Sequence, residues 1–334
     1  MRQPEFWRAD AGGRDAALAV RALLTPLSWA YAALTAHRLR TTNPRHVGVP
    51  VICVGNITVG GAGKTPVTRA IRAKLGAGAH TLSRGYGGRV AGPLRVTPDM
   101  EAREVGDEPL LHARDGGAWI ARDRVAGAQA AAQAGAHAII MDDGFQNPAL
   151  AKDLSILVFD PDYGVGNGHV LPAGPLREPL NKGLSRADAI VFLHNVAEAE
   201  EPMAHDWLAS FGKPVLHARI APTEPPPTGP LIAFAGLARP EKFFDTLEGA
   251  GGELIEAVPF PDHHPYTEDD FALLTQLAEE RAATLITTEK DAARLTPAWR
   301  QHVAVLPVTA RFDDEAALDA LLAPIRQRMY PAHG

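Results

Sequence analysis

The chain contains 334 residues, which exceeds the ~100–200 residues of a typical domain and predicts two domains. Hydrophobic residues make up 46% and charged residues 22% of the chain, a composition typical of globular proteins with substantial cores. The formal net charge of −6 argues against a general nucleic-acid-binding protein, because such proteins neutralise phosphates with a basic surface. Cys53 is the only cysteine, so no intrachain disulfide can form, and we expect it to be a small buried hydrophobe.

The N-terminal residues 1–45 are expected to form a helical segment. Leu18–Leu34 is largely apolar, but Arg21 and Pro26 interrupt it, so it lacks the ~20 consecutive apolar residues that a transmembrane helix needs. Arg21 also interrupts the apolar core that a secretory signal requires. An apolar face with flanking arginines suits a helix in a membrane interface, but also a helix packed on the protein's own core. The segment alone leaves both interpretations open.

From residue 49 onward, short apolar runs alternate with helical patterns, which predicts a parallel-sheet α/β architecture. The elements expected in the first part of the chain are strand Val49–Val54, helix Thr65–Leu75, helix Arg124–Ala134, and strands Ala138–Met141, Leu154–Phe159, Ala189–Leu193 and Pro214–Ala218.

The stretch Pro222–Pro230 contains five prolines and is expected to be a linker or a surface loop. On composition alone it is the favoured domain boundary. The α/β alternation resumes beyond it. The elements expected there are strand Leu231–Ala235, helix Glu241–Leu247, strand Leu254–Val258, helix Thr267–Ala282, strands Leu285–Thr288 and Val303–Val308, and helix Glu315–Met329.

The segment Gly55–Thr65 ends in Gly-Lys-Thr, follows an expected strand and opens an expected helix, which is the context of a phosphate-binding loop. Its glycines let backbone N–H groups surround phosphate oxygens, and the helix N-terminus adds partial positive charge. Lys64 would reach the β- and γ-phosphates, and the Thr65 hydroxyl would bind Mg²⁺. Thr58 stands where the usual motif begins with glycine. The expected nucleotide-binding residues are Thr58, Gly60, Gly61, Ala62, Gly63, Lys64 and Thr65.

The strand expected at Ala138–Met141 ends in Asp142 and Asp143. A carboxylate at the end of a buried strand is the usual metal-binding partner of a phosphate-binding loop. On their own, the two aspartates would more simply cap a turn after the strand. Together with the loop at Lys64, they favour a nucleotide–metal site.

Four further loops carry polar side chains suited to chemistry: Gly106–Pro109, Asp262–His264, Ser83–Gly88 and Leu171–Glu178. A histidine beside a carboxylate suits proton transfer near neutral pH, and an arginine on a glycine-rich turn suits an anionic substrate. Asp262–His264 has no third ligand at helical or hairpin spacing, so we do not predict zinc there. Each loop alone is better explained as a solvated connection.

Seven motifs occur along the chain in an order that resembles one known family. They are Val54–Pro66, Ser83–Gly87, Gly106–Pro109, Asp142–Gln146, Leu171–Glu178, Asp262-His263 and Thr288–Asp291. Together they span most of the chain and resemble the tetraacyldisaccharide 4′-kinase family of lipid A synthesis. The first motif, which includes Asn56 and Pro66, is far more specific than Gly-Lys-Thr alone.

The resemblance implies a kinase that uses ATP and Mg²⁺ to phosphorylate the 4′-hydroxyl of a lipid-linked glucosamine disaccharide 1-phosphate. Such enzymes work at the cytoplasmic face of the inner membrane of Gram-negative bacteria. The implied partners are this lipid-linked substrate and the membrane surface, without nucleic acid and without a required protein partner. The resemblance therefore favours the membrane-interface interpretation of residues 1–45.

The resemblance also implies roles for individual residues. Asp107 would accept the proton of the 4′-hydroxyl with His263 as its partner, and Lys64 and Arg177 would stabilise charge on phosphates. The implied metal-binding residues are Thr65, Asp142, Asp143 and Glu178. The implied substrate-binding residues are Asn56, Arg84, Arg124, Gln146 and Asn147. The family commonly has histidine where this chain has Asn147, which can hydrogen-bond but cannot carry charge or shuttle a proton.

The fold implied by the resemblance consists of two α/β/α sandwich domains joined by a two-stranded hinge, with an N-terminal amphipathic helix. The first, P-loop NTPase-like domain would cover residues 46–152, with the C-terminal residues 321–334 returning to it. The second domain would cover residues 153–320. The proline-rich stretch 222–230 remains the alternative boundary.

Two other functions share part of this pattern. A membrane-associated P-loop switch ATPase that recruits protein partners would use Lys64, Thr65 and Asp142 but would give His263 no special role. A GTPase is disfavoured, because no Asn-Lys-x-Asp motif for guanine is present. A soluble kinase of small metabolites would need no membrane contact from the N-terminal helix.

Overall fold

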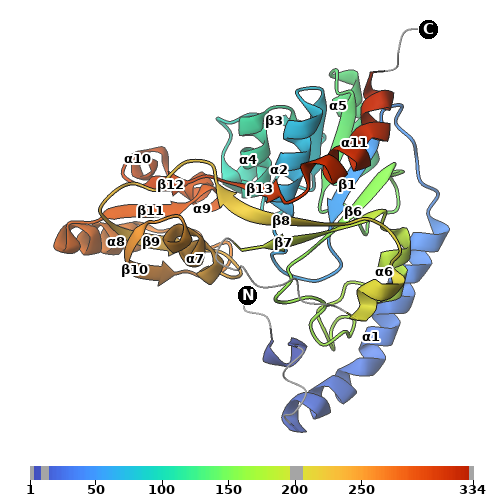
Figure 1. Cartoon of the computed structure of the whole chain (residues 1–334), viewed down its shortest axis with the longest axis horizontal. Helices are drawn as coiled ribbons and strands as arrows, with labels where there is room; N and C mark the ends of the chain where they lie inside the picture. The colour runs from blue at the N-terminus through green and yellow to red at the C-terminus, as the bar shows by residue number, and fades with distance from the viewer. Residues whose placement is uncertain (1–3, 9–14, 196–205, 331–334) are drawn as a thin grey trace.

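The computed structural model describes residues 4–8, 15–195 and 206–330. In these residues, two β-sheets are flanked by helices and lie side by side (Figure 1). The expected α/β class is therefore confirmed, and Cys53 is buried within the larger sheet as expected. The residues of each sheet form one lobe of the molecule.

The larger sheet contains nine strands among the described residues, and all are parallel to their neighbours except the two edge strands β3 and β13. In spatial order the strands are β13 (Val308–Phe312), β8 (Val215–Pro222), β7 (Ala189–His194), β6 (Leu154–Phe159), β1 (Val51–Gly55), β5 (Ala138–Asp142), β2 (Ala79–Ser83), β4 (Ala118–Ile120) and β3 (Leu94–Val96).

Both faces of the larger sheet are covered, because its central strands are apolar along their whole length. Along β1, Val51 and Cys53 face one core, whereas Ile52 and Val54 face the other. The larger lobe's helices include α2 (Lys64–Leu75) and α11 (Glu315–Met329) on one face and α5 (Arg124–Gln133) and α6 (Leu180–Arg186) on the other, with α3 (Ala102–Val105) and α4 (Asp107–Asp115) between the lobes.

The smaller sheet is wholly parallel and also lies between helices. Its strands, in spatial order, are β10 (Glu253–Pro259), β9 (Pro230–Ala235), β11 (Thr284–Thr288) and β12 (Ala304–Leu306). The accompanying helices are α7 (Glu241–Gly249), α8 (Glu268–Arg281), α9 (Glu289–Arg294) and α10 (Pro297–Arg300). Thr267 caps α8 through a reciprocal pair of hydrogen bonds with Asp270, in agreement with the expected start of this helix.

Sheet membership differs from the predicted start of the second domain at residue 153. Strands β6, β7 and β8 continue the larger sheet by pairing in turn from β1, and the smaller sheet begins only at Pro230. The chain leaves the larger sheet after Pro222, through the proline-rich stretch that composition favours as the boundary. The boundary at residue 153 was implied by the family resemblance, and the apolar pattern of a parallel strand cannot decide the matter because it is the same in either lobe.

The return to the larger lobe also differs from the prediction of a single strand at Val303–Val308. Pro307 separates β12, in the smaller sheet, from β13, which pairs antiparallel with β8 in the larger one. The two chain crossings therefore lie side by side, and the backbone N–H of Thr223 donates to Pro307 O at 2.9 Å. The family resemblance implies a two-stranded hinge, and the paired strands β8 and β13, which adjoin the two crossings, are the candidates for it.

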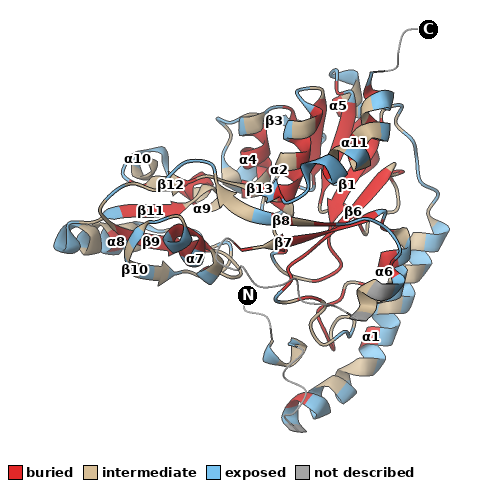
Figure 2. Ribbon diagram, viewed as in Figure 1, coloured by how far each residue is buried: buried red, intermediate tan, exposed pale blue. Residues whose placement is uncertain are grey.

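The N-terminal helix α1 (Asp15–Thr41) runs along the outside of the larger lobe (Figure 2). In contrast to the expectation from the sequence, Ala16–Thr41 is long and apolar enough to cross a membrane by length and composition. Core helices of soluble proteins and signal sequences share these properties, but this helix is not a core helix. Leu23, Trp29 and Leu34 are 78%, 70% and 71% exposed.

The packing of α11 generates the first prediction. Leu322 is fully buried in a core that it shares with α2, the helix that follows the phosphate-binding loop. We expect Leu322→Ala to lower the free energy of unfolding of the larger lobe by about 2–5 kcal/mol, because it leaves a cavity in a dense core. Chemical denaturation followed by circular dichroism measures this change. The control Leu273→Ala, at a 60% exposed position of α8, should change it by less than about 0.5 kcal/mol. Equal losses would contradict this packing.

Candidate functional site

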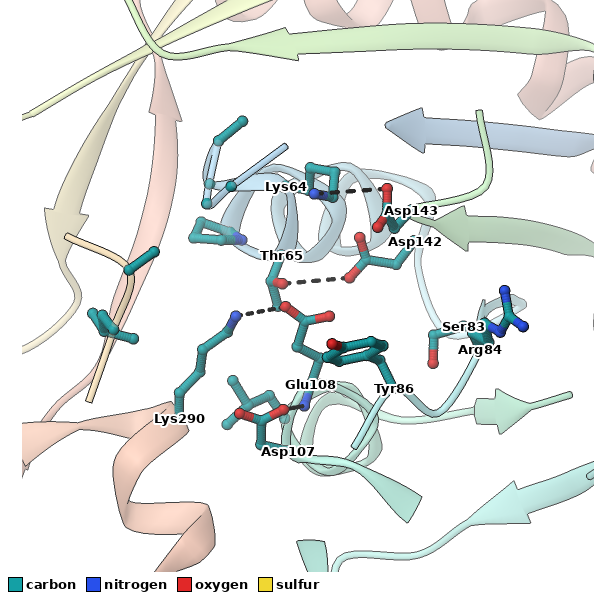
Figure 3. A pocket seen from close by; sticks show the side chains of 18 of the residues that line it. Lys64, Thr65, Ser83, Arg84, Tyr86, Asp107, Glu108, Asp142, Asp143 and Lys290 are labelled. Carbon is teal, nitrogen blue, oxygen red and sulfur yellow. Dashed lines mark hydrogen bonds and ion pairs between the residues drawn. The ribbon is translucent and has the colours of Figure 1, made fainter. Parts of the chain in front are cut away.

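A cavity of about 890 Å³ lies between the two lobes and collects most of the predicted site residues. Figure 3 shows Lys64, Thr65, Asp142 and Asp143 facing Asp107 across it, with Lys290 entering from the smaller lobe. The predicted residues that line the cavity are Gly60, Gly61, Ala62, Gly63, Lys64, Thr65, Arg84, Asp107, Arg124, Asp142, Asp143, Gln146, Asn147, Arg177 and His263. Three predicted residues do not line it: Asn56, Thr58 and Glu178.

The phosphate-binding loop connects β1 to α2 as the sequence predicts. Gly63 has φ 72°, and a Cβ there would lie 2.2 Å from Leu193 Cδ2, so only glycine fits this position. Asn56 is buried behind the loop, where its Oδ1 accepts a hydrogen bond from Lys64 Nζ at 3.4 Å. Thr58, the departure from the usual motif, pairs with Leu176 through a backbone bridge. Asn56 and Thr58 therefore shape the loop from outside the cavity.

The two aspartates at the end of β5 have different surroundings. Asp142 Oδ2 accepts from Thr65 Oγ1 at 3.4 Å, whereas Oδ1 is buried and lacks a hydrogen-bond partner among the described residues. Asp143 Oδ1 lies 2.9 Å from Arg177 Nη1 and 3.7 Å from Lys64 Nζ. Burial opposes the ionisation of Asp143, but the charges of Lys64 and Arg177 outweigh it and hold its pKa below the usual range.

His112 is a site residue that the sequence analysis missed. It lies on α4, is 1% exposed, and its Nε2 is 2.8 Å from Asp142 Oδ2. Its Nδ1 is buried and has no hydrogen-bond partner in the described part of the chain. The sequence carries no signal for this contact, because the two residues are 30 positions apart and meet only through packing of α4 on the sheet. The contact with His112 therefore orients the Asp142 carboxylate.

Asp107 begins α4 and is 5% exposed. Its Oδ2 accepts hydrogen bonds from Arg294 Nε, at 3.0 Å, and Nη2, and lies 3.3 Å from His263 Nδ1. Burial favours the neutral acid, but the hydrogen bond with His263 and the charges of Lys290 and Arg294 outweigh it and hold the pKa of Asp107 far below its usual range. The structure thus brings the predicted pair Asp107 and His263 together from opposite lobes.

His263 lies at the mouth of this contact and is 40% exposed. Its φ of 56° lies in the left-handed region, which is rare for a residue with a Cβ. The hydrogen bond to Asp107 raises the pKa of His263, although partial burial and Arg294 oppose this rise. His264 instead pairs with Asp270 at 2.9 Å. Asp262–His264 is therefore not a single cluster.

Arg84 and Arg124 line one side of the cavity. Arg124 is 5% exposed; its Nη1 donates to Ala121 O, and its Nε is buried without a partner in the described chain. Burial lowers the pKa of Arg124 to about 10, and the nearby charge of Arg84 adds to this effect. Two adjacent guanidinium groups with spare donors suit an anionic group of a ligand.

Glu178 differs from its predicted role as a metal ligand. Both of its carboxylate oxygens accept hydrogen bonds from Arg186 Nη2 at 2.5 Å, and Oε1 also accepts from Gln146 Nε2 at 3.2 Å. Glu178 is buried outside the cavity, and its negative charge is already balanced by the Arg186 guanidinium. Asn147 lines the cavity but uses its side-chain oxygen to accept from the backbone N–H groups of Ala149 and Leu150. Its contribution inside the cavity is therefore limited to its amide nitrogen.

The smaller lobe adds cations that the sequence analysis did not single out. Lys290 lies within the motif Thr288–Asp291 and pairs with Glu108 at 2.5 Å, and Arg294 follows one helical turn later. Arg239 and Lys242 both pair with Asp160, at the end of β6. The Thr288–Asp291 motif was the available signal for Lys290. No pattern in the sequence pointed to the pairing of Arg239 with Asp160.

The oxygen ligands near the phosphate-binding loop can be compared with what a divalent metal ion requires. No group of three or more His, Cys, Asp or Glu side chains suited to a metal is found among the described residues. Mg²⁺ does not need such a cage, because it keeps several waters and binds one or two protein oxygens together with phosphates. The unpartnered Asp142 Oδ1 beside the Thr65 hydroxyl fits this sparse requirement.

Comparison with known proteins shows the family of the chain. The family model described as tetraacyldisaccharide-1-P 4′-kinase matches residues 20–326. The tetraacyldisaccharide 4′-kinase of Phenylobacterium zucineum is 54% identical over 90% of this chain and 93% of its own length. That of Hyphomonas neptunium is 51% identical over 98% of this chain and 99% of its own length.

A solved structure gives the same answer for the fold. The LpxK protein from Aquifex aeolicus, crystallised in complex with ATP, matches with a TM-score of 0.74 and 30% identity, over 92% of this chain and 99% of its own. These findings confirm the resemblance inferred from the motifs. With its phosphate-binding loop facing an acid–histidine pair across one cavity, this chain belongs to the tetraacyldisaccharide 4′-kinase family.

Proposed function

We propose that this protein transfers the γ-phosphate of ATP to the 4′-hydroxyl of a tetraacyldisaccharide 1-phosphate, which yields lipid IVA in lipid A biosynthesis. The observation that carries this proposal is the shared cavity, in which the phosphate-binding loop and the Asp107–His263 pair face one another. A P-loop alone would serve any nucleotide-dependent protein. An acid–base pair opposite it supplies what a hydroxyl acceptor needs.

The nucleotide would lie on the loop residues Gly60–Thr65 at the N-terminus of α2. Backbone N–H groups and the helix dipole there favour phosphate oxygens, and Lys64 adds a charge near the β- and γ-phosphates. Lys64 is held toward the loop by Asn56 and Asp143. Arg177, paired with Asp143 on the same side, would stabilise charge on the transferring group.

Mg²⁺ fits the same region. Thr65 and Asp142 would hold it, with Asp143 close enough to bind its waters, and Glu178 is not needed. Held there, the ion would supply positive charge that offsets the negative charge developing on the phosphates during transfer. His112 keeps Asp142 oriented for this role.

The acceptor would approach from the side of Asp107 and His263. The pair removes the proton of the 4′-hydroxyl while its oxygen attacks the γ-phosphorus and ADP leaves. Arg84, Arg124 and Gln146 line the cavity nearby and are suited to the polar head of the substrate, including its 1-phosphate.

The exposed face of α1 supports action at the cytoplasmic surface of the inner membrane. Its large apolar side chains are solvent-exposed, and its C-terminal turn carries Arg38 and Arg40. Such a helix can lie in the membrane interface, where the acyl chains of the substrate are anchored. The Arg38 side chain also reaches Gln146 O, which joins this helix to the rim of the cavity.

The proposal is tested first by phosphoryl transfer. We expect the wild-type protein to move ³²P from γ-labelled ATP to tetraacyldisaccharide 1-phosphate in detergent micelles. Lys64→Ala and Asp107→Asn should each lower kcat by about 100-fold or more, because they remove phosphate stabilisation and the proton acceptor. Lys182→Ala, at an exposed position of α6, is the control and should retain full activity. A folded, ATP-binding wild type that labels no lipid would favour a switch ATPase that recruits protein partners.

The metal site is tested by nucleotide binding rather than by turnover. We expect Asp142→Asn to abolish most of the increase in ATP affinity that Mg²⁺ causes in wild type, because the amide cannot supply the anionic oxygen. Isothermal titration calorimetry with and without Mg²⁺ measures this effect. Glu178→Gln should leave the Mg²⁺ effect intact if the protein remains folded, and the reverse pattern would return Glu178 to the metal site.

The membrane proposal is tested by flotation with anionic vesicles. We expect wild type to float, and a variant with Leu23, Leu27 and Leu34 replaced by Glu to stay in the soluble fraction. These side chains lie on the exposed face of α1, so the change should remove lipid contact without disturbing the core. The control Leu273→Glu, in the smaller lobe, should float like wild type. A triple variant that still floats would contradict this role of α1.

A further inference from the structure

Arg294 is the smaller-lobe residue most extensively bonded to Asp107. It ends α9, and two of its nitrogens, Nε and Nη2, donate to Asp107 Oδ2 across the gap between the lobes. Its Nη2 also lies 3.3 Å from His263 Nδ1. Arg294 therefore touches both members of the acid–base pair, and it is only 9% exposed.

The Arg294 side chain is held in place by its own lobe. Its Nη1 donates to Asp291 Oδ1 and to Gly236 O, each at 3.0 Å. Asp291 is fully buried and is fixed by hydrogen bonds from the Gly236 N–H, the Tyr266 hydroxyl and the Thr288 hydroxyl. The guanidinium is therefore oriented by a network that belongs entirely to the smaller lobe, ready to meet Asp107.

Asp107 has few partners in its own lobe. Its Oδ1 accepts the Glu108 backbone N–H at 2.9 Å, whereas the contacts of Oδ2 come from Arg294 and His263. A buried carboxyl without these cations would favour its neutral form. The ionised, oriented state of Asp107 thus depends on the approach of the smaller lobe.

We propose that Arg294 is a positioning residue for phosphoryl transfer, which fixes Asp107 as an anion against His263 when the two lobes meet. The active pair is then assembled only in the closed molecule, so that transfer to water is suppressed while the lobes are apart. This inference rests on the proposed function, because it assigns Arg294 to the same reaction. The hydroxyl proton passes to the Asp107–His263 pair, the hydroxyl oxygen bonds to the γ-phosphorus, and the bond from that phosphorus to ADP breaks.

The charges around the pair determine the expected pH dependence. Arg294 and Lys290 face Asp107 from α9, and Lys290 is paired with Glu108. Asp262 lies 3.8 Å from His263 Nε2, and the Tyr86 ring lies 5.8 Å from the His263 ring. Removal of Arg294 takes one cation from both titrating groups, so the pKa of Asp107 and the pKa of His263 should rise together.

The experiment compares the pH dependence of kcat/KM for wild type, Arg294→Met and Arg294→Lys. We expect the acid limb of Arg294→Met to move to higher pH by about one unit or more, and Arg294→Lys to recover part of that shift because it keeps the charge. A purely structural role would lower activity equally at all pH values. Parallel profiles for the three proteins would overturn the proposal.

A second measurement does not depend on turnover. NMR titration of the His263 ring, assigned by comparison with His263→Asn, should show a higher pKa in Arg294→Met than in wild type. Arg281→Met, at an exposed arginine of the same lobe, is the matched control and should leave the titration unchanged. An unchanged His263 pKa in Arg294→Met would refute the positioning role even if the kinase activity is established. Absence of lipid phosphorylation by wild type would instead refute the proposed function, while this titration still reports on Arg294.

Discussion

The pairing of β1 with β5 is the constraint on which the site depends. These neighbouring parallel strands align Val54 with Asp142, so the phosphate-binding loop and the two aspartates leave the sheet at the same edge. Thr65 and Asp142, 77 positions apart in the chain, then come within 3.4 Å. The carboxyl edge of a parallel sheet is where α/β proteins bind ligands, because the loops that follow the strands converge there. A slip of one residue in this register would turn the Asp142 side chain to the opposite face.

The smaller lobe contributes charged side chains to the site at the edge of the larger sheet. The larger lobe presents carboxylates at Asp107, Glu108 and Asp160, and the smaller lobe presents Arg294, Lys290, Arg239 and Lys242 to them. Within the described residues 206–330, the chain crosses between the lobes twice, after β8 and just before β13, and these two strands pair antiparallel in the larger sheet. Opposite charges across a two-stranded connection favour approach of the lobes, while ligands with phosphates can compete for the same cations.

Local patterns account for most of the elements and for the nucleotide side of the site. The loop at Lys64, the strand that ends in Asp142 and the cap of α8 at Thr267 follow from apolar runs, glycines and capping residues that act within a few positions. The apolar pattern of β6 could not decide between the boundary at residue 153 and the proline-rich alternative, because the pattern is the same whichever sheet the strand joins; β6 in fact pairs with β1 in the larger sheet. Likewise, the family resemblance implies that Glu178 binds the metal, yet its carboxylate forms an ion pair with Arg186, eight residues later in the chain.

The sequence by itself determined the nucleotide-binding chemistry, the α/β class and the family, because each depends on residues that are close in the chain or on their order along it. Only the tertiary structure decided which side chains face the reacting groups. His112 behind Asp142 and Arg294 against Asp107 come from helices packed across an interface, 30 and 187 positions away. The free energy of such contacts depends on burial and on the approach of charges in three dimensions, and neither leaves a periodic signal in the sequence.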